Sequence, residues 1–331
     1  MAENLCRKLI GYPMTEHEMD ATPSEDTVEA VENRPTHSGF VALIGPTNAG
    51  KSTLVNHLVG AKVSIVSHKV QTTRAVMRGI AIHNNAQIVF MDTPGIFKPR
   101  RRLDRAMVTS AWGGAKDADI ILLLIDSERG LKGDAQTILE GLKDVKQTKI
   151  LCLNKIDQVQ REDLLKLASA ANEIVNFDRT FMISATNGSG CDDLMNYLSD
   201  ELPQGPWYYP EDQISDLPMR QLAAEITREK LFLRLHQELP YASHVETEKW
   251  EERKDGSVRI EQVIYVERDS QKKIALGKNG DAIKAISSSS RKELSAILEQ
   301  TVHLFLFVKV RENWGDDPER FREMGLEFPR N

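Results

Sequence analysis

Between residues 40 and 202, short apolar segments alternate with stretches whose apolar residues recur at helical spacing. The apolar segments are FVALIG (40–45), AQIVFMD (86–92), ADIILLLID (118–126), TKILCLNK (148–155) and RTFMISA (179–185). Two other stretches, residues 161–175 and 191–202, have the period of amphipathic helices. Because the strand segments are apolar throughout, the pattern predicts an α/β fold with a mainly parallel sheet and helices on both faces.

The pattern changes after residue 202. PQGPWYYPEDQISDLP (203–218) contains four prolines and no apolar period, which predicts a linker whose aromatic residues pack the two domains together. Beyond it we expect a helix over 220–236, a hairpin turning at 254–257, helices on both sides of GKNG (277–280) and a last strand over 302–310. The sequence therefore predicts a first domain over 39–202 and an α+β second domain over 219–331.

Composition is consistent with a two-domain globular chain. The 331 residues are 40% apolar and 28% charged, which supplies a sizeable core. The longest apolar run, Ile120–Ile125, is far too short to cross a bilayer. The three cysteines (Cys6, Cys152 and Cys191) have no paired spacing, which is typical of a reducing cytosol. The eight histidines form no metal-binding motif, so we expect no structural metal.

The first 38 residues form a separate acidic segment. They carry eight Asp or Glu and three Lys or Arg, a net charge of −5, and the whole chain carries −6. The segment lacks the apolar core of a signal peptide, and its acidity argues against a transit peptide. We expect a disordered extension. The remaining charge of about −1 says little about partners.

The stretch GPTNAGKST (45–53) fits the phosphate-loop pattern GxxxxGK[ST] and lies between a strand and a helix. Glycines let successive backbone N–H groups approach phosphates, and the helix dipole points at the same oxygens. Lys51 is expected to reach the β- and γ-phosphates and Ser52 to bind Mg²⁺. The residues predicted to contact phosphate are Gly45, Asn48, Ala49, Gly50, Lys51, Ser52 and Thr53.

Two later motifs select guanine. NKID (154–157) follows a buried strand, and Asp157 can accept two hydrogen bonds from guanine N1–H and N2–H₂, which adenine does not offer together. Asn154 is expected to brace the surrounding loops, and the stem of Lys155 to lie on the base. In SAT (184–186), Ser184 and Ala185 follow the last strand, and the Ala185 N–H is expected to reach guanine O6.

DTPG (92–95) completes the nucleotide motifs. Asp92 is expected to hold Mg²⁺ through a water, and Thr93, Pro94 and Gly95 to sense the γ-phosphate. The preceding loop, residues 67–79, should supply a threonine to the metal. Thr73 is the first candidate and Thr72 the second, because two adjacent threonines cannot be separated by pattern.

The residue after DTPG is Ile96, where many switch GTPases have a glutamine that orients the attacking water. Isoleucine cannot orient a water. Residues 40–202 nevertheless resemble a translation-factor-class GTPase, and Asn48 matches an asparagine that binds potassium in many such proteins. The resemblance implies that a potassium ion supplies the charge that an arginine finger gives elsewhere. The alternative is that Asn48 only caps the loop.

The second domain contains a GxxG turn that predicts nucleic-acid binding. Between two short helices, such a turn lets a phosphate backbone approach closely, while apolar side chains contact unstacked bases. Alone, GxxG also fits an ordinary bend between helices. The candidate RNA-binding residues are Gly277, Lys278, Asn279, Gly280, Arg268, Lys272, Lys273, Ile274, Ile283 and Lys284.

The order helix, hairpin, GxxG helices and final strand resembles a type II KH domain. Placed after a GTPase domain and WYYPEDQISD, the phrase VERDSQKKIALGKNG resembles the Era family of bacterial GTPases over about residues 38–316. The resemblance implies Mg²⁺-dependent GTP hydrolysis and binding to the 3′ end of 16S ribosomal RNA, in rRNA processing and 30S subunit assembly. It also implies a mostly monomeric, cytoplasmic protein that associates peripherally with the inner membrane.

Several functions remain open from the residues. The first is a switch in which GTP orders the threonine loop and thereby changes how the second domain holds RNA. The others are an ordinary hydrolase or modification enzyme, an RNA-binding module with a vestigial nucleotide site, and a membrane-associated signalling GTPase. No second catalytic motif supports an additional enzyme activity. Lys51, Ser52, Asp92 and Asp157 together argue against a vestigial site.

Overall fold

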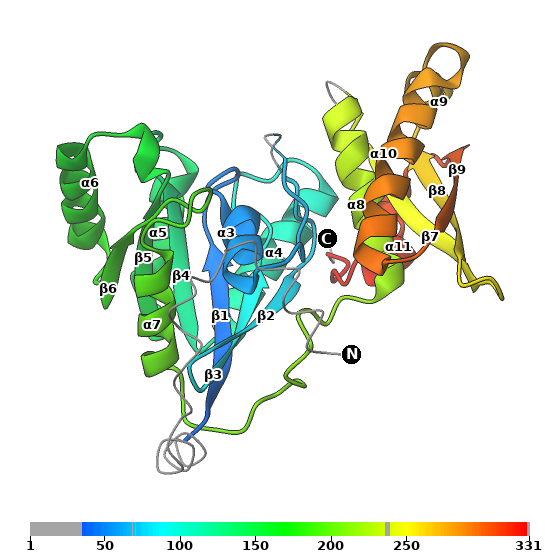
Figure 1. Ribbon diagram of the computed structural model, residues 1–331. Helices are drawn as coiled ribbons and strands as arrows, with labels where there is room; N and C mark the ends of the chain where they lie inside the picture. Colours follow the sequence, from blue (N-terminus) through cyan, green and yellow to red (C-terminus); the bar gives the residue numbers. More distant parts are fainter. Residues whose placement is uncertain (1–34, 68, 70, 236–238, 330–331) are drawn as a thin grey trace, which may run out of the picture. The chain divides into compact units, whose positions relative to one another are not determined.

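The computed structural model describes residues 35–67, 69, 71–235 and 239–329, drawn in colour in Figure 1. Residues Thr36–Asn331 form one compact unit. The disordered extension was expected over residues 1–38. Of these, residues 1–34 lie outside the described residues. The predicted end of the extension is wrong, because His37 and Ser38 pair with Ala86 and Gln87 in the first strand.

The first sheet has six strands in the order β2-β3-β1-β4-β5-β6. The strands are β1 (His37–Ile44), β2 (Met77–His83), β3 (Ala86–Asp92), β4 (Ile120–Asp126), β5 (Thr148–Asn154) and β6 (Arg179–Met182). All neighbours are parallel except β2 and β3. The predicted mainly parallel α/β fold is therefore confirmed.

Helices cover both faces of this sheet (Figure 1). They are α3 (Lys51–Val59), α4 (Arg102–Asp117), α5 (Asp134–Leu142), α6 (Arg161–Ile174) and α7 (Cys191–Glu201), with a short 3₁₀ turn η1 (Ile156–Gln158). Apolar residues of α3 and α7 pack on one face, and those of α4, α5 and α6 pack on the other. The strands are buried from both sides, which explains their continuous apolar sequences.

Two strands differ from the sequence prediction. The sequence pattern did not predict β2, which is the antiparallel edge strand. It follows the polar loop, within residues 67–79, that we expected to supply a threonine to the metal. The predicted strand over 179–185 is three residues too long. It ends at Met182, because the Ser184 N–H leaves the sheet and donates to the Ser189 carbonyl (3.0 Å).

The linker is fastened to the first sheet. The buried side chain of Gln87 accepts hydrogen bonds from the N–H groups of Tyr208 (2.8 Å) and Tyr209 (3.0 Å), and it donates to the Tyr209 carbonyl (2.8 Å). Further along, the Ile80 N–H donates to the Ile214 carbonyl (2.9 Å) at the edge of β2. The prediction that the aromatic residues join the two domains is wrong for Tyr208, whose ring lies 5.0 Å from that of Phe40.

The second sheet has three strands in the order β7-β8-β9, with β7 antiparallel and β9 parallel to β8. Its elements are α8 (Met219–Arg234), β7 (Ser243–Glu252), β8 (Val258–Val266), α9 (Asp269–Leu276), η2 (Lys278–Gly280), α10 (Asp281–Leu298), β9 (Val302–Val310), η3 (Trp314–Asp316) and α11 (Pro318–Glu323). Helices α8 and α10 pack on the sheet through two apolar clusters. This mixed sheet with helices α9 and α10 after its second strand is the predicted type II KH arrangement.

The C-terminal segment was not predicted. Trp314 and Phe321 are buried and pack against Leu103 and Met107 of α4. The Trp314 indole also donates to the Ala242 carbonyl (3.0 Å). The segment therefore joins the KH sheet to a helix of the first domain. Within the described part of the chain, no helix has both the length and the apolar character needed to cross a bilayer.

His244, on β7, is a buried titratable group in this region. Its ring stacks on Trp314 with the centroids 5.6 Å apart. Burial, together with the charges of Arg74, Arg320 and Arg228, lowers its pKa to about 3. One nitrogen or oxygen of His244, Glu246 and Glu323 lies within 4.8 Å of the others, a grouping that the sequence did not indicate. Arg320 pairs with both carboxylates and so supplies their counter-charge.

The buried His244 predicts a pH-dependent stability. Below the ordinary histidine pKa of 6.5, the unfolded chain takes up a proton that the folded chain excludes. The free energy of unfolding should therefore fall by about 1.4 kcal/mol for each pH unit below 6. His244→Gln should lack this contribution. Urea unfolding of both proteins at pH 7, 6 and 5 measures the difference, and parallel pH dependences would contradict the assignment.

Candidate functional site

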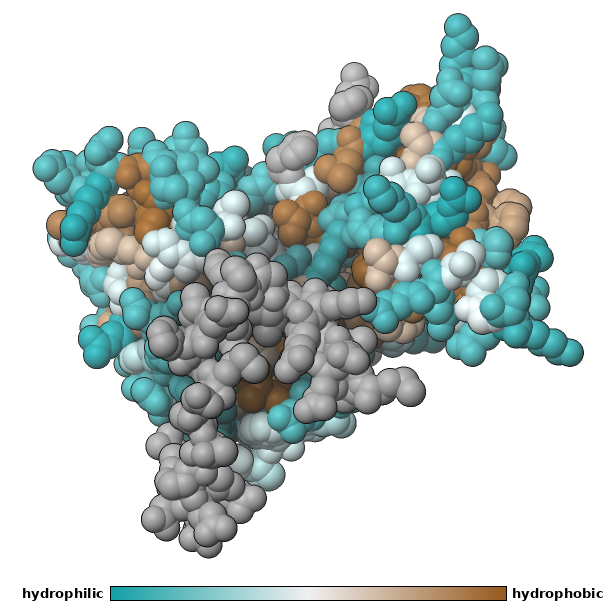
Figure 2. Space-filling model, viewed as in Figure 1, coloured by the Kyte–Doolittle hydropathy of each residue, from teal (hydrophilic) through white to brown (hydrophobic). Residues whose placement is uncertain are grey.

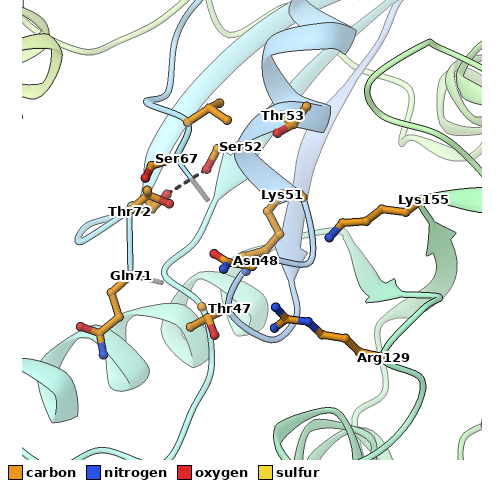
Figure 3. A pocket seen from close by; sticks show the side chains of 14 residues that line it. Thr47, Asn48, Lys51, Ser52, Thr53, Ser67, Gln71, Thr72, Arg129 and Lys155 are labelled. Atoms are coloured by element: carbon orange, nitrogen blue, oxygen red, sulfur yellow. Dashed lines mark hydrogen bonds between the residues drawn. The ribbon is translucent and has the colours of Figure 1, made fainter. Parts of the chain in front are cut away.

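A cavity of about 360 Å³ opens at the carboxyl ends of the parallel strands, where α/β proteins bind ligands. It is lined by the loop before α3, the segment after it, one residue of DTPG and two cations from later loops (Figure 3). The lining residues are Thr47, Asn48, Gly50, Lys51, Ser52, Thr53, Val66, Ser67, Gln71, Thr72, Thr73, Gly95, Arg129 and Lys155. Most of the predicted phosphate-binding residues are thus brought together.

The phosphate loop has the conformation that its glycines require. Gly50 has φ of 100°, and an added Cβ would lie 2.3 Å from Asn154 Nδ2. The helix α3 starts at the next residue, so its first N–H groups face the cavity. Lys51 Nζ donates to the carbonyls of Gly45 (3.1 Å) and Pro46 (3.0 Å). Burial lowers the pKa of Lys51 to about 8, against the opposing charge of Asp92.

Three oxygen-bearing side chains meet beside Lys51. Ser52 Oγ donates to Asp92 Oδ2 (2.7 Å), and Thr73 Oγ1 donates to the same oxygen (3.1 Å). Asp92 is fully buried, and its Oδ1 has no hydrogen-bond partner among the described residues. Hydroxyl and carboxylate oxygens are the ligands that Mg²⁺ prefers. This donor set therefore fits a magnesium ion.

The two candidate threonines have different surroundings. Thr73 is buried and its hydroxyl lies 3.0 Å from Ser52 Oγ. The carbonyl of Thr72 accepts a hydrogen bond from Arg228 of α8, and no hydrogen bond joins its side chain to Asp92 in the described structure. The geometry favours Thr73 as the metal ligand.

DTPG contributes through its backbone. The Thr93 hydroxyl donates to the Leu43 carbonyl (2.6 Å), so this side chain faces the sheet. Gly95 lines the cavity, and Ile96 N–H next to it donates to the Gly45 carbonyl (3.0 Å). Pro94 is buried. The side chain of Ile96 is 4% exposed and belongs to the apolar core under α4, so it takes no part in the site.

The guanine motifs are connected by Asn154. Its side chain donates to the Ala49 carbonyl (2.8 Å) and accepts from the Ala185 N–H (3.0 Å), as the predicted brace requires. In this structure the Ala185 N–H is therefore bonded to Asn154. Asp157 is exposed, and the neighbouring Ser184 hydroxyl lowers its pKa. An ionised, exposed carboxylate is suited to accept hydrogen bonds from a guanine edge.

Sequence motifs did not identify Asp126 and Arg129. Lys155 Nζ forms an ion pair with Asp126 Oδ2 (2.6 Å), and Arg129 Nε lies 3.5 Å from the same oxygen. Both cations line the cavity. The only signal of Asp126 and Arg129 in the sequence is their place at the end of the buried strand ADIILLLID and three residues beyond it, at the edge of the sheet that binds ligands.

The GxxG turn is formed as expected. Gly277 has φ of 75°, and an added Cβ would lie 2.7 Å from Ala282 N. Asn279 and Gly280 also have positive φ, so the chain reverses sharply before α10 begins at Asp281. In Figure 2 the tip of the second domain, where α9 meets α10 in Figure 1, is hydrophilic. The backbone of this turn is open to an approaching strand.

Charged and apolar side chains flank the turn. Arg268, Lys273, Lys278 and Lys284 are exposed, and Lys272 is half-buried. Ile274 is 57% exposed, as a base-contacting residue would be. Ile283 and Leu276 are partly buried and pack against the core of the domain. Of the predicted apolar contacts, only Ile274 is therefore fully available on the surface.

Comparison with protein families gives two matches. A family model described as a 50S ribosome-binding GTPase matches residues 40–155, and one described as a KH domain matches residues 238–315. The chain is 89% identical over 317 residues to the GTPase Era of Agrobacterium fabrum, covering 96% of this chain and 98% of that protein. It is 72% identical over 308 residues to the GTPase Era of Brucella suis, covering 93% and 98%.

Two solved structures share the fold. Each has a TM-score of 0.83 and 37% identity, over 88% of this chain and 99% of the other. One is Era in complex with MgGDPNP and nucleotides 1506–1542 of 16S ribosomal RNA. The other is a variant of Aquifex aeolicus Era bound to GDP·AlF4⁻. A match over 88% of this chain is longer than either domain alone, so the likeness extends over both domains.

The geometry at Asp92 predicts different roles for the two threonines. Thr73→Ala should raise the Mg²⁺ concentration needed for half-maximal GTP hydrolysis by about tenfold or more, because it removes a hydroxyl from the metal donor set. Thr72→Ala is the matched control, since it leaves the backbone carbonyl bonded to Arg228. A magnesium titration of phosphate release measures both. An equal Mg²⁺ requirement in the two variants would exclude Thr73 as the ligand.

Proposed function

The chain belongs to the Era family of GTPases, and on that premise we propose that it is a GTP-hydrolysing switch that binds the 3′ end of 16S ribosomal RNA. We further propose that it acts in 16S rRNA processing and 30S subunit assembly. One observation carries the switch. The segment that brings Thr73 to Asp92 is also bonded to the KH domain, so the nucleotide site and the RNA site share a structural element.

The chain's own residues fit the proposed chemistry. Lys51 and the amides of the phosphate loop would hold the β- and γ-phosphates, and Asp157 would select guanine. Ser52, Thr73 and Asp92 would hold Mg²⁺, which would neutralise charge on the phosphate oxygens. All of these residues belong to the first domain.

The chain between α3 and β2 that carries Thr72 and Thr73 is called the threonine segment here, and it begins at Lys62. Helix α8 contacts this segment at several points. Arg228, whose side chain is 1% exposed, donates to the Thr72 carbonyl. Glu229 accepts from the Val66 N–H (2.9 Å) and pairs with Lys62 (2.7 Å). Lys69 donates to carbonyls at the C-terminal end of α8, where a cation also meets the negative end of the helix dipole. These bonds fix the backbone on the N-terminal side of Thr73.

Arg74 extends the contact to the start of β7. Its guanidinium donates to the carbonyls of Ser243 (2.9 Å), Pro240 (3.3 Å) and Tyr241 (3.4 Å). Arg74 is buried, so these bonds form away from water, where an unpaired guanidinium would be strongly destabilising. A movement of Thr73 therefore requires either a movement of the KH domain or the loss of these bonds.

This arrangement gives a physical basis for a switch. If the γ-phosphate and Mg²⁺ hold Thr73, they also favour one position of residues 62–74 against α8. A ligand changes an equilibrium only by its difference in affinity for the two states. RNA that prefers the same arrangement of α8 and α10 will then bind with an affinity that depends on the nucleotide, and the effect is reciprocal.

An RNA-binding module with a vestigial nucleotide site is the alternative. It leaves unexplained the complete set of metal and guanine residues and the bonds between Thr73, Ser52 and Asp92. A role as a signalling GTPase at the membrane, a cytoplasmic location with peripheral membrane association, and a mostly monomeric state stay predictions from the family resemblance.

The proposed switch is tested by RNA affinity in three nucleotide states. Binding of an oligonucleotide with the 16S 3′-end sequence, measured with a GTP analogue, with GDP and without nucleotide, should differ by about 5–150-fold. Glu229→Gln should reduce this difference, because it weakens the bonds to Lys62 and Val66. Glu162→Gln, an exposed change on α6, is the control. Equal affinity in all three states of the wild-type protein would refute the switch.

The RNA site has an independent test. Lys278→Glu places a negative charge on the GxxG turn and should weaken RNA binding by about tenfold or more, with GTP hydrolysis nearly unchanged. Electrophoretic mobility shift and phosphate-release assays measure the two activities on the same sample. Loss of both activities together would contradict separate nucleotide and RNA sites.

We also propose that a potassium ion bound by Asn48 assists hydrolysis. Asn48 lines the cavity with φ of 64°. Turnover should be faster in potassium than in sodium by about tenfold or more, and Asn48→Ala should remove most of the difference. Equal turnover of the wild-type protein in both salts would exclude potassium.

A further inference from the structure

Arg129 lies across the cavity from Thr72 and Thr73. In Figure 3 its guanidinium points toward Thr47 and Asn48 of the phosphate loop. We propose that Arg129 donates to the triphosphate during hydrolysis and stabilises the charge that develops there. This inference rests on the proposed GTPase function and names a catalytic contact made by this chain itself.

Asp126 fixes the loop that carries Arg129. The carboxylate ends β4 and is 4% exposed. Its Oδ1 accepts from the Glu128 N–H (3.1 Å), and its backbone carbonyl accepts from the N–H groups of Arg129 (3.1 Å) and Gly130 (3.0 Å). These bonds form a tight turn directly after a buried strand. The backbone of Arg129 is therefore held at the mouth of the cavity.

The same carboxylate orients the side chain. Asp126 Oδ2 faces Arg129 Nε at 3.5 Å, on the inner side of the guanidinium. A carboxylate at Nε leaves the two terminal nitrogens available, and these present a planar fork that fits phosphate oxygens. The side chain of Arg129 is 61% exposed, so it can move toward a bound nucleotide without breaking a packed core.

The position of Arg129 complements that of Lys51. Lys51 is buried under the phosphate loop and approaches phosphates from within, whereas Arg129 approaches over Thr47 from the solvent side. The residue after DTPG, Ile96, is in the core, so no glutamine side chain from that position reaches the cavity. The main remaining way to accelerate hydrolysis is to place positive charge beside the phosphoryl group, where negative charge develops in the transition state. Arg129 supplies such a charge within the same chain.

The test compares Arg129→Gln, Arg129→Lys and the control Lys132→Gln, which removes an exposed positive charge from the same connection between β4 and α5. Arg129→Gln should lower kcat for GTP by about tenfold or more and leave the affinity for GDP within about threefold, as expected for a contact made in the transition state. The kcat of Arg129→Lys should lie between those of the wild type and Arg129→Gln, since lysine keeps the positive charge but lacks the planar pair of terminal nitrogens. Lys132→Gln should behave as wild type.

Fluoroaluminate provides a second measurement. With fluorescently labelled GDP bound to the wild-type protein, the fluorescence should change when fluoroaluminate is added, because GDP and fluoroaluminate together mimic the transferred phosphoryl group. Arg129→Gln should lose this signal while it still binds GDP, which excludes misfolding as the cause. A normal fluoroaluminate signal, kcat within threefold of wild type in both potassium and sodium, or an equal loss of GTP and GDP affinity would each overturn the inference. If the wild-type protein does not hydrolyse GTP, the proposed function itself fails.

Discussion

The rest of the structure depends on one buried carboxylate. Asp92 ends strand β3, and two hydroxyls donate to it, that of Ser52 at the start of α3 and that of Thr73 in the loop between α3 and β2. A buried carboxylate without a cation is unfavourable, and burial accordingly raises the pKa of Asp92. A divalent ion would remove this penalty and would bind three segments of the chain at once. Thr72, next to Thr73, is hydrogen-bonded to Arg228 of α8. The same ion would therefore also affect the position of the KH domain.

Ile96 shows how one position can change from a catalytic to a structural role. As a core residue, it fixes the segment after DTPG against the phosphate loop through the bond between its N–H and the Gly45 carbonyl. Rate acceleration must then come from charges near the phosphates, and the cavity offers Lys51, Arg129 and the polar environment of Asn48. A hydrolase built in this way relies on fixed charges, rather than on a glutamine side chain, to promote the attack of water on the phosphate.

Sequence reasoning succeeded where a local pattern carries the chemistry. The phosphate loop, NKID and the GxxG turn each fix their geometry within a few residues, and the apolar strands predicted the parallel sheet. It failed where a residue's role depends on distant partners. No sequence motif marks Arg74 or Arg228, which are buried at the contact between the threonine segment and the KH domain. Edge strand β2, the C-terminal residues around Trp314 and the cavity cation Arg129 depend likewise on tertiary contacts that no short motif encodes.

The attachment of the linker limits how far the two domains can separate. Gln87 holds residues 208–209, the edge of β2 holds Ile214, and Arg78 pairs with Asp216 (2.7 Å). Only Leu217 and Pro218 then remain before α8 begins at Met219. A tether this short keeps the KH domain at a high effective concentration beside the threonine segment, so rebinding after release is an intramolecular step. If these contacts open during the proposed switch, they can therefore form again without the two domains having to find each other in solution.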